Sequence, residues 1–256
     1  MKKLLEINPL FFYIIAGIGI FIGVYYLFRN RSLRVKMIFM YLGCAASIVF
    51  FLVNKSLHYF VNNKHILLLL PFNLCYVSLF FTPVALRFKH KVFYDFIFYI
   101  SSLGAVFAII FPSRAHVEGI FTPITFTYFC YHFLVIVIPF WLFMWKMYSP
   151  KISFKGTLKL FGVLFGTALI MHGLNILLIK NGLPDANYFW TMARNGSENV
   201  AILAAFAAIL PVDFFYLLFC IPILYAYIGI WNLAIYLSER FSGSADKLEQ
   251  TPSKKL

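Results

Sequence analysis

Three side chains in otherwise apolar sequence could do covalent chemistry: the thiol of Cys75 and the imidazoles of His132 and His172. A thiol becomes a nucleophile when a base within hydrogen-bond reach takes its proton, and either histidine could supply that base from another helix. A buried cysteine is also commonly a small apolar filler. Cys75 is therefore a candidate nucleophile for group transfer, with a packing role as the alternative.

Further polar side chains occur in the same apolar stretches. Thr125, Tyr128 and His132 follow an i, i+3, i+7 spacing and share a helix face, and His172 shares another face with the residue three positions later, Asn175. Asn73 lies two residues before Cys75, so on a regular helix the two would point about 160° apart. We expect them on different faces.

Polar groups in hydrocarbon are costly unless they face a protein interior or a wet cavity. One interpretation is a cavity, open to the outside, that Asn73, Tyr128, His172 and Asn175 help to line. Its outer rim would lie in loops that carry Arg114 and the Asn187-Tyr188 pair. The alternative is that each group bonds a neighbouring helix or its own backbone and only holds the helices together.

The elements that must position these groups are membrane-spanning helices. The 256 residues are 62% hydrophobic and 12% charged, whereas soluble proteins carry about 25% charged residues. Apolar runs of about 20 residues are long enough to cross about 30 Å of hydrocarbon. The sequence predicts an all-α, seven-transmembrane-helix bundle, with spans at 9–28, 36–53, 66–86, 92–111, 121–145, 157–180 and 212–237.

Charge between the spans predicts the topology. Fifteen lysines and arginines fall in the connections after spans one, three and five and in the tail, and seven fall on the opposite side. The positive-inside rule then places the amino terminus outside and the carboxyl terminus in the cytoplasm. We expect one domain over residues 1–242, a short interfacial helix at 200–210, and a disordered tail at 243–256.

Several classes of function are disfavoured. The net charge of +13 is spread over interhelical loops without a basic helical face, so no nucleic-acid partner is expected. The four cysteines lie in apolar segments, and acidic residues are few and scattered, so neither disulfides nor a metal site is predicted. No cofactor is expected either.

A series of short motifs resembles the YwaF-like family of bacterial integral membrane proteins, which is related to eukaryotic transmembrane protein 164. The stretch Leu70-Pro71-Phe72-Asn73-Leu74-Cys75 is similar to the family's Leu-Pro-x-His-Leu-Cys element, with Asn73 at the histidine position. The other matching elements, in family order between about residues 66 and 237, are 98–104, Pro112, Tyr128 to His132, Asn187-Tyr188 and Pro211.

The eukaryotic relative is described as an acyltransferase that acts on ether phospholipids through a cysteine. The resemblance implies Cys75 as the acyl-accepting nucleophile, His132 as its catalytic partner, and Asn187 and Tyr188 at the outer rim. It also implies a membrane lipid as the partner and a bacterial plasma membrane as the location. Two alternatives stay open: a non-enzymatic binder or transporter of a lipid or small molecule, and a structural membrane protein.

Overall fold

A computed structural model describes residues 9–61, 63, 65–112, 121–193 and 200–249, and over this part of the chain it contains helices and no strand. Its elements are α1 (Pro9–Phe28), α2 (Leu33–Phe60), the 3₁₀ turn η2 (Ile66–Leu69), α3 (Leu74–Phe88), α4 (Lys91–Asp95), the π-helical η3 (Phe96–Ser101), α5 (Ser102–Ile110), α6 (Pro123–Met144), α7 (Phe154–Lys180), η5 (Tyr188–Trp190), α8 (Ala201–Ile209), η7 (Phe215–Phe219) and α9 (Cys220–Glu249).

Six helical segments among the described residues are long and apolar enough to cross a membrane: Phe11–Phe28, Leu33–Phe60, Lys91–Ile110, Pro123–Met144, Phe154–Lys180 and Phe215–Arg240. The predicted span at 66–86 is wrong as one continuous helix, and the count of seven spans is not confirmed. Within it, α3 has 15 residues, which at about 1.5 Å per residue falls short of about 30 Å of hydrocarbon.

Pro71 explains the break. A residue that precedes proline is pushed into an extended conformation, and Leu70 has ψ 150°. Asn73 is also extended, with ψ 152°, so α3 begins only at Leu74. The predicted helix therefore becomes a 3₁₀ turn, an extended bend and a shorter helix.

Other boundaries also differ from those predicted. The helix predicted at 36–53 runs from Leu33 to Phe60, because Ser32 caps its start with a bond from the Val35 amide. The last helix continues to Glu249, so the first part of the tail predicted to be disordered is helical. Residues 250–256 lie outside the described part.

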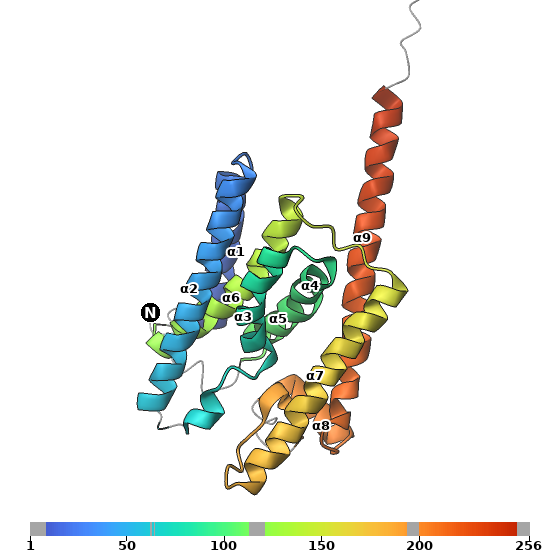
Figure 1. Cartoon of the computed structure of the whole chain (residues 1–256). Helices are drawn as coiled ribbons and strands as arrows, with labels where there is room; N and C mark the ends of the chain where they lie inside the picture. Colours follow the sequence, from blue (N-terminus) through green and yellow to red (C-terminus); the bar gives the residue numbers. More distant parts are fainter. Residues whose placement is uncertain (1–8, 62, 64, 113–120, 194–199, 250–256) are drawn as a thin grey trace, which may run out of the picture.

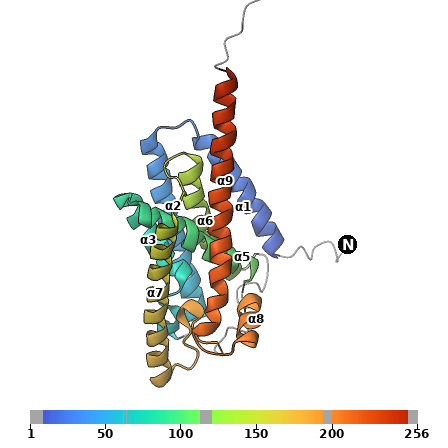
Figure 2. The same cartoon turned by 90° about the vertical axis from the view of Figure 1, so that its right-hand side faces the viewer.

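The core lies where α2, η3 and α6 meet. Phe98 and Tyr99 of the π-helical turn are fully buried, and they belong to the same cluster as Trp141 of α6. In Figure 1, α7 and α9 lie together on one flank of the bundle that α2, α3, α5 and α6 form, with α8 at their lower end. Figure 2 shows the same flank from the front, with α9 running well past the bundle.

Candidate functional site

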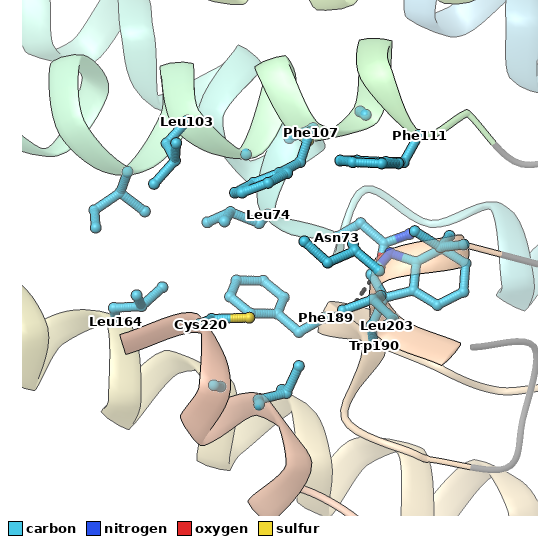
Figure 3. A pocket seen from close by; sticks show the side chains of 18 of the residues that line it. Asn73, Leu74, Leu103, Phe107, Phe111, Leu164, Phe189, Trp190, Leu203 and Cys220 are labelled. Atoms are coloured by element: carbon cyan, nitrogen blue, oxygen red, sulfur yellow. Dashed lines mark hydrogen bonds between the residues drawn. The ribbon is translucent and has the colours of Figure 1, made fainter. Parts of the chain in front are cut away.

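A cavity of about 510 Å³ lies between the bundle and its flank. One wall carries Leu103 and Phe107 of α5, and the facing wall carries Leu164 of α7, Leu203 of α8 and Cys220 of α9 (Figure 3). Aliphatic and aromatic side chains make up most of the lining. The size is that of a pocket for an ordinary small ligand, about 300–1,000 Å³.

Four of the predicted site residues line this one cavity: Asn73, Cys75, Tyr128 and His132. Asn73 and Cys75 come from the start of α3, and Tyr128 and His132 come from the amino-terminal half of α6. Cys75 and His132 make no hydrogen bond to each other, although both face the cavity. The candidate nucleophile and the candidate base therefore line the same cavity but are not hydrogen-bonded to each other.

The hydrogen bond that His132 makes defines the tautomer of its imidazole ring. Its Nδ1 lies 2.9 Å from the backbone oxygen of Tyr128, one turn earlier on α6. A carbonyl oxygen only accepts, so Nδ1 carries the hydrogen and Nε2 of the neutral ring keeps its lone pair. The rings of Tyr128 and Tyr131 lie 4.3 Å from the imidazole, centroid to centroid, and fix its plane.

Cys75 is the second residue of α3, so its thiol lies in the first turn of that helix. Gly104 of α5 passes close to this turn. A Cβ added at Gly104 would lie 3.8 Å from Cys75 Sγ and 3.1 Å from Leu74 Cδ2. A glycine at this position lets α5 approach the turn of α3 that carries Cys75.

Asn73 faces the same cavity as Cys75, which corrects the expectation that the two point apart. That expectation assumed a regular helix, but Asn73 precedes α3 and is extended. Its Oδ1 accepts a hydrogen bond of 2.9 Å from the backbone amide of Phe189. Asn73 therefore ties the start of α3 to the segment after α7.

His172 and Asn175 are not among the residues that line the cavity. The side chain of Asn175 donates to the backbone oxygen of Tyr188 and accepts from its amide, both at 2.8 Å. It also donates to Thr191 Oγ1 at 2.8 Å, and His172 Nδ1 lies 3.2 Å from that hydroxyl. These contacts match the alternative in which the polar groups of span six hold neighbouring structure together.

Asn187 and Tyr188 belong to the segment so held. Asn187 exchanges two hydrogen bonds of 2.9 Å with the backbone of Met192. The Tyr188 hydroxyl donates to the backbone oxygen of Leu67, and burial raises the pKa of Tyr188 to about 12, which keeps the donor protonated. Neither residue lines the cavity, but their neighbours Phe189 and Trp190 do. Arg114 lies outside the described residues.

Two polar residues that the sequence reasoning missed line the cavity from α2: Lys55 and His58. Lys55 donates to the Tyr76 hydroxyl at 2.9 Å and lies 4.3 Å from the centre of that ring. The predicted span ended at residue 53, which placed both outside the membrane segment. Their i, i+3 spacing at the end of an apolar run was the signal that could have identified them.

Comparison with known proteins gives one match. The model of the TMEM164 family matches residues 4–232. No curated protein and no solved structure matches the chain.

Proposed function

The chain belongs to the TMEM164 family, and we propose that its cavity binds a membrane lipid whose acyl group is transferred through Cys75. Its long apolar helices and its family make it an integral membrane protein. The observation that carries the proposal is that Cys75 and His132 line one largely apolar cavity.

The apolar walls suit an acyl chain. The acyl chain of a membrane lipid already lies in hydrocarbon, so the walls between α5 and the flank of α7 and α9 need only offer it an equally apolar site. Polar side chains gather around Asn73, Cys75 and His132, where the ester group would lie. Lys55 also lines the cavity and would attract a lipid phosphate.

The transfer follows from the two side chains. The Cys75 thiol gives its proton to Nε2 of His132, and the sulfur attacks the ester carbonyl carbon. A carbon–sulfur bond forms, the carbon–oxygen ester bond breaks, and the departing alkoxide takes the proton from His132. The acyl group then passes to the hydroxyl of an acceptor lipid by the reverse steps. The hydrogen bond between thiol and imidazole would form only when substrate is bound, as is common in enzymes.

The test is covalent labelling of the purified protein by a phospholipid that carries an alkyne-tagged acyl chain. We expect a hydroxylamine-sensitive acyl label on wild type and none on Cys75→Ala. Cys220→Ala is the matched control, because Cys220 lines the same cavity at the start of α9. A label that survives in Cys75→Ala, or that is lost only in Cys220→Ala, would remove Cys75 from the reaction.

A non-enzymatic lipid binder is the second candidate, and the absence of a Cys75–His132 hydrogen bond favours it. It predicts that the tagged lipid copurifies with the protein without a covalent bond. Equal retention of lipid by wild type and Cys75→Ala, with no thioester in either, would select this function.

We also propose that η2, the bend and α3 together form a seventh membrane segment, with the amino terminus outside a bacterial plasma membrane. Support comes from three predicted cytoplasmic connections, whose residues Lys36, Lys89 and Lys146 line one hollow. In a cysteine-free background, an impermeant thiol reagent added to intact cells should label Asn181→Cys and not Lys151→Cys. The reverse pattern would invert the topology.

A further inference from the structure

A second hollow, of about 460 Å³, shares no lining residue with the cavity described above. It lies where the first turn of α2 meets the segments that follow α3 and α6. Its lining includes Lys36 of α2, Lys89 after α3, Tyr94 of α4, and Trp145 and Lys146 after α6. Three lysines from three separate parts of the chain therefore meet at one place.

No carboxylate is among the described residues that line this hollow. Asp95, one residue after Tyr94, is engaged elsewhere: it bonds Lys91 at 2.6 Å and the Tyr148 hydroxyl at 2.5 Å. The carboxyl ends of α3 and α6 each contribute only about half a negative charge, and the amino end of α2 adds about half a positive one. The hollow therefore keeps a strong positive potential.

The backbone at two of the lysines is unusual. Lys89 has φ 53° and Lys146 has φ 58°, in the left-handed region that glycine adopts freely and other residues rarely do. Lys89 lies at the carboxyl end of α3 and Lys146 lies at the carboxyl end of α6, and glycine is common at such helix ends. Both positions instead carry a long cationic side chain, and strained residues of this kind cluster at functional sites.

Two further contacts prepare the hollow for an anion. The Lys36 ammonium donates to the Arg29 backbone oxygen at 2.8 Å and lies 5.7 Å from the centre of the Trp145 ring, which holds it in place. The indole Nε1–H of Trp145 is buried and has no hydrogen-bond acceptor among the described residues. Because this nitrogen has essentially no exposed surface, it does not face the hollow, and the lysines carry the donors there.

We propose that this basic hollow binds a phosphate-bearing anion, either the phosphomonoester headgroup of an anionic membrane lipid or a free phosphate. Lys36, Lys89 and Lys146 supply the charge, and the helix start of α2 supplies further donors. Basic pockets between membrane helices bind phosphorylated headgroups in this way. The proposal is independent of the acyl-transfer cavity and of Cys75.

The test uses the purified full chain in a nonionic detergent, with dioctanoyl phosphatidic acid as the probe. The variant Lys89→Gly/Lys146→Gly removes two charges and relieves both left-handed residues, so it should fold at least as stably as wild type. We expect its affinity for the probe to fall by about tenfold or more, since each lysine near an anionic lipid contributes about a fivefold factor. Dioctanoyl phosphatidylcholine, which has no net charge, should bind both proteins equally.

Lys155→Gln/Lys159→Gln is the matched control, because it removes two charges from exposed positions on α7 outside the hollow. Its affinity should stay within about twofold of wild type if the lipid is held by the hollow rather than by diffuse charge. Equal losses in both pairs, or none in the glycine pair, would overturn the proposal. Inorganic phosphate that displaces the probe at equal concentration would identify the ligand as a soluble phosphate, and much weaker displacement would identify a lipid.

Discussion

The imidazole Nδ1 of His132 donates to the backbone oxygen of Tyr128 over 2.9 Å, which leaves Nε2 of His132 as the free acceptor of the ring. This relationship gives the histidine the tautomer that a general base needs. It also orients the ring from its own helix.

The first prediction concerns that base. His132→Ala should slow formation of the acyl-cysteine by about 10²–10⁴-fold, the usual contribution of a general base. The measurement is the rate of hydroxylamine-sensitive labelling by the tagged phospholipid. His172→Ala is the control, because His172 contacts Thr191 and not the cavity. Equal rates for His132→Ala and wild type would remove His132 from the chemistry.

A second prediction separates stability from binding at Asn175. Asn175→Ala leaves the amide of Tyr188 without its acceptor and removes one of the two donors to the Tyr188 carbonyl, which keeps the Thr191 amide at 3.4 Å. A buried group left unsatisfied costs about 1–3 kcal/mol. The unfolding temperature in detergent should fall clearly. His172→Ala, which loses one contact of 3.2 Å, should lower it much less. If Asn175→Ala instead abolished lipid binding with an unchanged unfolding temperature, the residue would contact the ligand directly.

A third prediction uses the close approach at Gly104. Gly104→Leu would extend beyond a Cβ that already lies 3.1 Å from Leu74 Cδ2 and 3.8 Å from Cys75 Sγ. The larger side chain should fill part of the cavity, reduce acyl labelling, and cost about 1–3 kcal/mol of stability from overpacking.

Gly162→Leu on α7 is the control, since nothing lies within 4 Å of a Cβ added there. It should retain both labelling and stability. Labelling that is unaffected by Gly104→Leu would mean that no ligand passes between α5 and Cys75.

The fourth prediction concerns Lys55. Lys55→Gln should weaken binding of a phospholipid by about fivefold and leave binding of a diacylglycerol unchanged, because only the phosphate interacts with the ammonium. Lys55→Arg should retain most of the affinity. Retention of copurified lipid, quantified by mass spectrometry, measures both. An equal loss for the two lipids would assign Lys55 a packing role on the Tyr76 ring.

Much of this architecture was predictable, because the length of each apolar run can be counted directly in the sequence. The first helix was predicted at the residues where it lies, and the short helix at 200–210 differs by one residue at each end. Two predictions were wrong for local reasons. The hydrophobic run from residue 66 predicted a continuous helix, although Pro71 breaks it. The second span was predicted to end at residue 53, although its helix continues past Lys55 to Phe60. Hydropathy is averaged over a window of residues, so it detects neither a single proline nor a partly buried lysine near a helix end.

The candidate site was predictable in part for the same reason. Depth in the membrane grouped Asn73, Tyr128 and His132 with Cys75, and all four line one cavity, although helical spacing wrongly placed Asn73 on a different face from Cys75. The predicted depth in the membrane could not distinguish the four cavity residues from His172 and Asn175. The hydrogen-bond partners of these two residues lie in a segment of the chain that has no periodic pattern. The contacts of Asn175 depend on how residues 187–191 fold back, which is a tertiary property.

The length of α9 has a mechanical consequence. Its 30 residues extend about 45 Å, whereas hydrocarbon accounts for about 30 Å. The apolar stretch that could cross the membrane ends at Arg240, so the last nine residues, to Glu249, extend the helix about 14 Å beyond it. These last turns would therefore stand in the aqueous phase, at a height that is set by the length of one continuous helix.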